Sequence, residues 1–112
     1  MYQYNATFTS VYDGDTATAT IDLGFYVKLE VTVRLLGIDT PELRGGTKES
    51  KARGLAARDR LRELILGKQL QVVSVKGNDS FGRWLVVIQV PGEARSINQQ
   101  LLDEGHAVPF MV

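Results

Sequence analysis

Hydrophobic and polar residues alternate along several short stretches of this chain, which is the pattern of half-buried β-strands. In the clearest run, apolar residues on one face alternate with polar residues on the other, in the order Val27, Lys28, Leu29, Glu30, Val31, Thr32, Val33, Arg34 and Leu35. Four other stretches are rich in β-forming residues, namely residues 4–12, 16–22, 70–75 and 84–90. Together these segments predict five strands.

Between the third and fourth predicted strands the apolar spacing changes to that of a helix. From about Glu49 to Leu66 the apolar residues on one helical face are Ala57, Leu61, Leu64 and Ile65. Gly67 follows where such a helix should end. Near the C-terminus, Ser96 with Gln99 three residues later predicts a capping box at the start of a short second helix.

The element order is three strands, a helix, two strands and a helix. It favours a mainly β fold, a five-stranded Greek-key barrel of the oligonucleotide/oligosaccharide-binding (OB) type, with one helix between strands three and four and a short C-terminal helix. A ferredoxin-like sandwich would need a different order, βαββαβ. The 112 residues fit one domain spanning residues 1–112.

Composition narrows the classes of function. Thirteen basic and thirteen acidic side chains cancel, which argues against nucleic-acid binding by bulk charge but leaves room for a local cationic site or a metal. The chain has no Cys and one His, so thiolate sites are excluded and a His-based site is disfavoured. No apolar run suggests a membrane span and the start lacks a signal peptide, so we expect a cytoplasmic monomer, although secretion with a removed leader remains open.

Four polar segments are candidates for chemistry: D-G-D-T at 13–16, R-L-L-G-I-D-T-P-E at 34–42, the basic loop after it, and D-S-F-G-R at 79–83. Each alone is more typical of a turn or a solvated surface. An EF-hand calcium loop is excluded. With Asp13 as position one of such a loop, Ala17, Thr18 and Gly24 stand where it requires an oxygen ligand, a glycine and a glutamate, in that order. The two carboxylates around Gly14 therefore need another explanation.

Taken together, these segments resemble the staphylococcal nuclease (thermonuclease) family from about Tyr4 to Phe110. The resemblance rests on V-Y-D-G-D-T, V-R-L-L-G-I-D-T-P-E, D-S-F-G-R-W-L and S-I-N-Q-Q-L-L-D-E-G-H-A, in the family's order and spacing. It implies a five-stranded barrel. It also implies a Ca²⁺-dependent endonuclease that cleaves DNA and RNA with little sequence preference and leaves 3′-phosphates and 5′-hydroxyls.

The resemblance also implies a role for each matching residue. Asp15 and Asp39 correspond to the calcium-binding carboxylates, and Thr40 to a ligand through its main-chain carbonyl. Glu42 corresponds to the proposed general base, and Arg34 and Arg83 to the phosphate-binding arginines. Physical chemistry agrees, because calcium prefers oxygen ligands and guanidinium groups offer a planar fork of donors to phosphate.

Two further residues complete the predicted site. Asp13 is expected to shape the turn that aims Asp15 and to lie just behind it. Phe81 is expected at the substrate, where the family often has Tyr, so a hydroxyl that could touch phosphate is missing. The base-stacking tyrosines near the C-terminus are also absent, with Phe110 and Met111 in that region, and we expect weaker nucleotide binding as a result.

Two other classes of function remain open. One is a non-catalytic nucleic-acid-binding barrel, although the chain has neither a basic surface nor an evident aromatic stacking platform. The other is an assembly module in which the acidic turns are inert. The complete set Asp15, Arg34, Asp39, Glu42 and Arg83 favours the nuclease.

Overall fold

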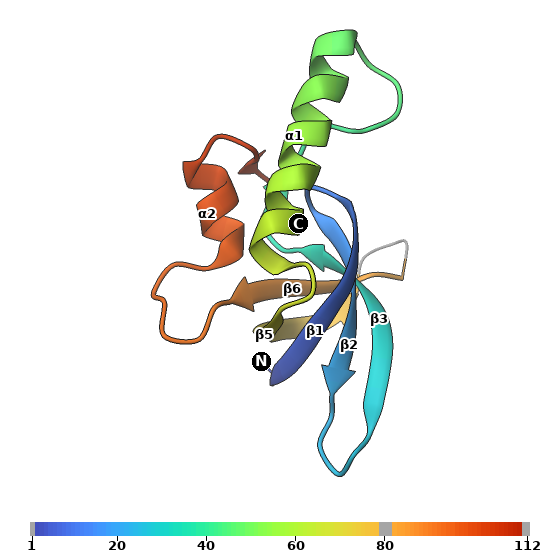
Figure 1. Cartoon of the computed structure of the whole chain (residues 1–112), viewed down its shortest axis with the longest axis vertical. Helices are drawn as coiled ribbons and strands as arrows, with labels where there is room; N and C mark the ends of the chain where they lie inside the picture. The colour runs from blue at the N-terminus through green and yellow to red at the C-terminus, as the bar shows by residue number, and fades with distance from the viewer. Residues whose placement is uncertain (1, 79–81, 111–112) are drawn as a thin grey trace.

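In the computed structural model, which describes residues 2–78 and 82–110, strands close into a barrel and helices pack against it (Figure 1). The elements in chain order are β1 (Tyr2–Asp13), β2 (Thr16–Asp22), β3 (Lys28–Leu35), β4 (Ile38–Asp39), α1 (Lys48–Ile65), β5 (Gln69–Asn78), β6 (Trp84–Gln89), α2 (Ile97–Asp103) and β7 (Val108–Pro109). The order around the barrel is β1-β2-β3-β6-β5, and β5 closes it by pairing with β1. The predicted five-stranded OB-type barrel is confirmed.

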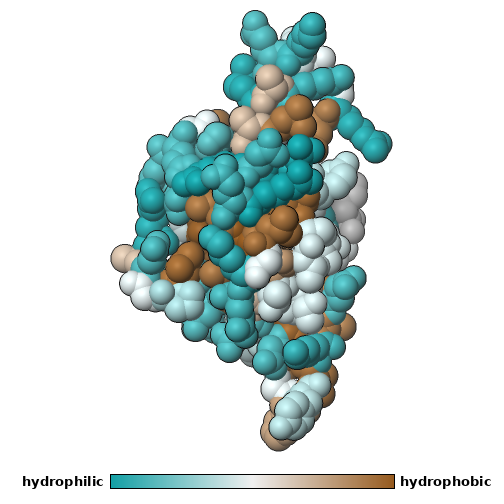
Figure 2. Space-filling model, in the orientation of Figure 1, coloured by the Kyte–Doolittle hydropathy of each residue, from teal (hydrophilic) through white to brown (hydrophobic). Residues whose placement is uncertain are grey.

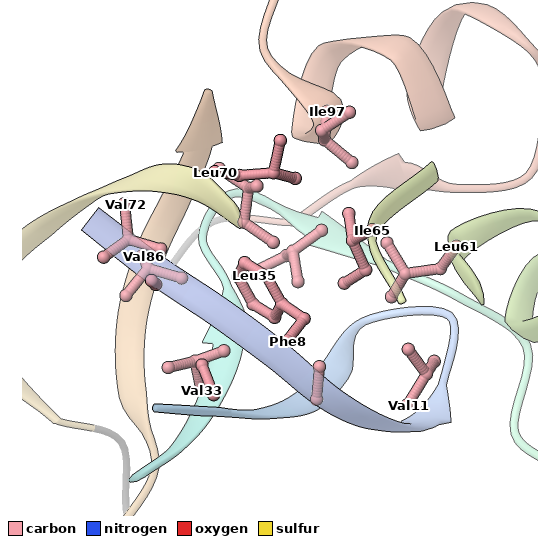
Figure 3. Close-up of a cluster of buried hydrophobic side chains, with 14 of the residues drawn as sticks. Phe8, Val11, Val33, Leu35, Leu61, Ile65, Leu70, Val72, Val86 and Ile97 are labelled. Carbon is pink, nitrogen blue, oxygen red and sulfur yellow. The ribbon is translucent and has the colours of Figure 1, made fainter. Parts of the chain in front are cut away.

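The barrel interior is filled by the apolar faces of the strands and is closed on one side by the helices. Phe8 of β1 and Leu35 of β3 lie at the centre, and Leu61 and Ile65 of α1 and Ile97 of α2 pack toward them (Figure 3). These five side chains are almost completely buried. Burial of this apolar surface is the main force that fixes α1 and α2 against the barrel.

Helix α1 begins and ends within about one residue of its predicted bounds. Thr47 caps its N-terminus through a capping box with Ser50, a pair that the sequence analysis did not identify. Gly67 follows the C-cap at φ 74°, a left-handed conformation that glycine adopts without steric cost. The predicted helical face is buried at Ala57, Leu61 and Ile65 and partly buried at Leu64.

The prediction of a capping box at α2 is half wrong. Ser96 does accept a hydrogen bond from the Gln99 backbone N–H at 3.0 Å. The Gln99 side chain, however, turns along the helix and donates to Asp103 at 2.8 Å, because this carboxylate lies one turn away on the same face. Buried Asn98 fixes the helix instead, donating to the carbonyls of Leu36 and Val86.

The predicted burial of one whole face of residues 27–35 is also wrong. Val33 and Leu35 are buried, but Val27 and Leu29 are 52% and 50% exposed. The outer half of the β2–β3 hairpin projects beyond the barrel, so no element covers it (Figure 1). Its end carries hydrophobic surface, whereas the far end of α1 is hydrophilic (Figure 2).

Two very short strands, β4 and β7, were not predicted. Asp39 pairs with Val108 and Ile38 with Pro109, so the segment after α2 returns to the end of β3. A two-residue pairing leaves no period in the sequence to detect. No helix within the described ranges is both long and apolar enough to span a bilayer.

An ion pair joins the two helices at the surface. Arg60 of α1 donates from Nε and Nη2 to the two carboxylate oxygens of Glu104, at 2.6 and 2.9 Å. These hydrogen bonds from Arg60, aided by one from Gln100, lower the pKa of Glu104 from 4.5 to about 2. The contact therefore favours ionised Glu104 and stabilises the docking of α2 on α1.

We expect Glu104→Gln to lower the free energy of unfolding by about 1 kcal/mol at pH 7, since solvent screening limits such a pair. The folded-state pKa is depressed, so the stabilisation is present above about pH 4.5 and is lost as the pH falls toward 2. Urea denaturation of parent and variant at pH 7 and pH 3 should show the difference shrinking on acidification. A difference that is zero at pH 7, or equal at both pH values, would contradict this account.

Candidate functional site

Two carboxylates that are distant in sequence lie side by side at one end of the barrel. Asp15 lies in the β1–β2 turn, directly before β2, and Asp39 ends β4. Nη2 of Arg34, on β3, lies 3.5 Å from Asp15 Oδ2 and 3.3 Å from Asp39 Oδ1. The Asp15 side chain is 8% exposed and that of Asp39 is 49% exposed. The pair thus has a buried member and a member open to solvent.

Buried Asp15 is held by a dense set of hydrogen bonds. Thr40 donates to Asp15 Oδ2 from both its backbone N–H and its hydroxyl, each at 3.2 Å. Thr16 donates from its hydroxyl to Oδ1 at 3.0 Å. These bonds fix the orientation of the carboxylate, and they link the β1–β2 turn directly to the segment after Asp39.

Asp13 lies behind Asp15, as expected for a supporting residue. Its Oδ1 accepts a hydrogen bond from the Asp15 backbone N–H at 3.0 Å. Burial raises the pKa of Asp13 from 3.8 to about 6, and the hydrogen bond and negative charge of Asp15 add to the rise. The turn thus concentrates negative charge in a partly buried place.

Arg34 is fixed from the other side as well. Its Nη1 donates to the carbonyls of Ile38 and Leu35, at 3.2 and 3.5 Å. The ring of Phe110 covers its guanidinium, with Cζ 5.1 Å from the ring centroid, a cation–π geometry. Sequence analysis did not foresee this contact, which depends on the return of the chain through β7.

The other predicted residues differ in how closely they join this cluster. Arg83 donates from Nη1 to the Thr16 hydroxyl at 3.2 Å, so one residue separates it from Asp15. The Glu42 side chain is exposed and makes no hydrogen bond or ion pair with any residue in the described ranges. Phe81 lies outside the described residues.

Gly54 of α1 sets the position of the loop that carries Glu42. A Cβ at this glycine would lie 2.7 Å from the Pro41 carbonyl oxygen and 3.1 Å from that of Glu42. Only a residue without a side chain allows the helix to approach this backbone so closely. In the sequence, the sign of this close approach is a glycine inside a helical pattern. The sequence does not show which backbone lies against it.

Gly14 has the same role between the two aspartates of the first turn. A Cβ here would lie 2.8 Å from Ala57 Cβ on α1 and 2.8 Å from Thr40 Cγ2. Such distances are too short for carbon–carbon contact, so glycine is needed for the turn to pack between the helix and Thr40. Packing, more than turn conformation, explains why a glycine separates Asp13 from Asp15.

We expect Gly14→Ala to destabilise the protein by about 1–3 kcal/mol, as overpacking of a closed site does. Displacement of Thr40 would also disturb Asp15, so the phosphodiester hydrolysis that the resemblance implies should slow by roughly 10- to 100-fold. Chemical denaturation and initial rates test this. The double variant Gly14→Ala/Ala57→Gly makes room on the helix side and should recover part of the stability relative to the sum of the single variants. A Gly14→Ala protein as stable and as active as the parent would exclude this role.

The donor chemistry of the cluster suits a hard divalent cation. The guanidinium nitrogen already lies between the two carboxylates, which shows that a positive charge is favoured there. In residues 2–78 and 82–110 no three His, Cys, Asp or Glu side chains are grouped to hold an ion. Asp15 and Asp39 would therefore need main-chain oxygens and water molecules to complete the roughly six to eight oxygen ligands that calcium takes.

The sequence of the chain matches a known family and two known proteins. Residues 32–112 match the family described as staphylococcal nuclease homologue. The chain is 34% identical over 105 residues to endonuclease YncB and 35% identical over 105 residues to SPbeta prophage-derived endonuclease YokF, both of Bacillus subtilis (strain 168). Each alignment covers 92% of this chain but 46% and 33% of the respective relatives, so the chain spans less than half of their length. The chain belongs to the staphylococcal nuclease family.

Proposed function

We propose that this chain is a calcium-dependent endonuclease that hydrolyses phosphodiester bonds of DNA and RNA with little sequence preference and leaves 3′-phosphates. The observation that carries the proposal is the convergence of Asp15 and Asp39 on a single nitrogen of Arg34. Family membership and the endonuclease names of both relatives support it. The supply of positive charge is local, which suits a protein of zero net charge.

In this proposal Asp15, Asp39 and the Thr40 carbonyl would hold the calcium ion. When bound, calcium neutralises charge on a phosphate oxygen and helps to place a water molecule. The half-exposed side chain of Asp39 leaves the site open to substrate. Asp15 is a fixed anchor, because it is held by hydrogen bonds from Thr40 and Thr16. The two carboxylates thus have different tasks, set by their burial.

The phosphate is bound by the two arginines. Arg34 is held through Nη1 by carbonyls, and Nη2 is the end that contacts half-exposed Asp39. Arg83 reaches the site through Thr16. Negative charge on the phosphoryl oxygens grows as water attacks, and preformed donors aimed there lower the barrier.

Glu42 takes a proton from the attacking water in this scheme. The new P–O bond forms as the P–O5′ bond breaks, the 3′-side keeps the phosphate, and the leaving 5′-oxygen receives a proton from solvent. Glu42 is three residues beyond Asp39 and its side chain is exposed, so substrate can approach it. Its loop is positioned by the close packing of Gly54.

Digestion of single-stranded DNA, duplex DNA and RNA with calcium, and then with a chelator, tests the proposal. We expect calcium-dependent degradation, with 3′-phosphate ends detected by mass spectrometry of a defined oligonucleotide. Binding without cleavage would support the non-catalytic barrel instead. Neither binding nor cleavage would support an assembly module.

A further inference from the structure

A pocket of about 510 Å³ opens beside the acidic pair, between α1 and the segment that follows α2. In Figure 1 this segment runs back alongside α1 to reach β4. The pocket shares Asp39 and Thr40 with the candidate site. Its other walls include Pro41, Arg53, Ala56, His106 and Val108.

The walls combine apolar surface with one available cation. Pro41, Ala56 and Val108 provide apolar contact of the kind that a base or sugar buries. Arg53 is exposed and makes no hydrogen bond or ion pair with any residue that the structure describes. Glu104 also lines the pocket, but its charge is matched by both donors of Arg60. Arg53 therefore remains able to meet an anion from outside.

The pocket and Arg83 are linked to different oxygens of the Asp15 carboxylate. Arg83 contacts Thr16, and Thr16 contacts Asp15 Oδ1. Thr40 contacts the other oxygen, Oδ2, and lines the pocket, whereas Thr16 and Arg83 do not. A polymeric substrate with its phosphate between the aspartates and Arg83 would thus have the pocket beside it, next to Thr40.

We propose that this pocket receives the nucleotide next to the bond that is cleaved, with Arg53 on the adjoining phosphate and the base between Pro41, Val108 and the His106 ring. The proposal rests on the nuclease function proposed above and adds a subsite to it. An apolar cleft with one guanidinium suits a nucleotide without regard to base identity, since every base offers a flat face. It explains how a chain of zero net charge can hold a longer substrate.

The test compares two substrates in the parent and in Arg53→Ala. For a 12-nucleotide single strand we expect KM to rise about fivefold, as for loss of one exposed ion pair, with kcat changed less than about twofold. Bis(p-nitrophenyl) phosphate has no neighbouring nucleotide, so its hydrolysis should not change. Lys51→Ala is the matched control, because Lys51 is an exposed cation two residues earlier on α1 and does not line the pocket.

A second variant fills the pocket without removing charge. Ala56→Phe should also raise KM for the oligonucleotide and leave the small diester unaffected, with thermal melting as the check on folding. Equal KM values for Arg53→Ala and Lys51→Ala, or a parent-like KM for Ala56→Phe, would overturn the subsite.

Binding separates this proposal from the nuclease proposal. Fluorescence anisotropy of a labelled 12-nucleotide strand with calcium, measured in a Glu42→Gln background so that the strand stays intact, should show weaker binding after Arg53→Ala than after Lys51→Ala, and a salt slope smaller by about 1 than in that background alone. A parent protein that binds the strand but cleaves neither substrate would refute the nuclease function. The anisotropy comparison would then still test whether the pocket binds the strand. Identical anisotropy curves for the two variants would refute the pocket.

Discussion

Replacing Asp15 by asparagine is expected to slow phosphodiester hydrolysis by at least about 1000-fold at saturating substrate. The amide keeps the size of the side chain and can still accept from Thr40, but it removes the charge that anchors a cation. Charge stabilisation by a bound metal is worth several kcal/mol, and each 1.36 kcal/mol corresponds to about tenfold in rate. Initial rates on duplex DNA at fixed calcium provide the measurement.

An aspartate at the far end of β2 offers the control. Asp22 ends β2 and accepts a hydrogen bond from the Gly24 backbone N–H at 2.9 Å, at the hairpin end of the strand. Asp22→Asn removes the same charge and should leave the rate within about twofold of the parent, as surface substitutions away from a site do. Rates for Asp15→Asn and Asp22→Asn that agree within tenfold would remove Asp15 from the catalytic machinery.

Arg34→Met is expected to have two separable effects. Without calcium it leaves Asp15 and Asp39 facing each other with no cation, which should lower the free energy of unfolding by about 3 kcal/mol. With calcium at about 100 times its Kd, linkage should return up to roughly 2.7 kcal/mol of this loss. Loss of the phosphate donor should still reduce kcat about 100- to 1000-fold, and calcium should not restore it.

Thermal melts with and without calcium, together with kcat, distinguish these effects. Arg34→Lys keeps the positive charge but lacks the planar, forked donors of a guanidinium group. It should therefore retain most of the free energy of unfolding and little of kcat. Arg95→Met removes an exposed arginine paired with Asp103 and should change stability by less than about 1 kcal/mol. An Arg34→Met protein whose stability is independent of calcium would contradict the placement of the ion.

The barrel was predictable because its strands bury alternating faces that leave a period of two in the sequence. The same alternation wrongly predicted burial of Val27 and Leu29, which are exposed. The sequence does not show how far the hairpin extends beyond the barrel. Helix α1 was predictable from its buried face, and its end from Gly67. Local periodicity thus recovered every element long enough to have a period.

Residues of the candidate site could be named from the sequence, but the contacts that support them could not. The resemblance pointed to Asp15, Asp39 and Arg34, and the structure brings their side chains into contact. The contact of Phe110 with Arg34 and the close packing at Gly14 join segments far apart in the chain. A single sequence carries no record of such pairs, because each depends on the final register of the fold.

The central claim is that Asp15 and Asp39 together hold one calcium ion beside Arg34. Calorimetric titration of calcium into the parent, Asp15→Asn, Asp39→Asn and the double variant tests it most directly. We expect one ion per parent chain, a loss of more than about tenfold in affinity for either single variant, and little further loss in the double variant, because both carboxylates serve the same ion. A parent that binds no calcium, or a single variant that binds it as tightly as the parent, would contradict the claim.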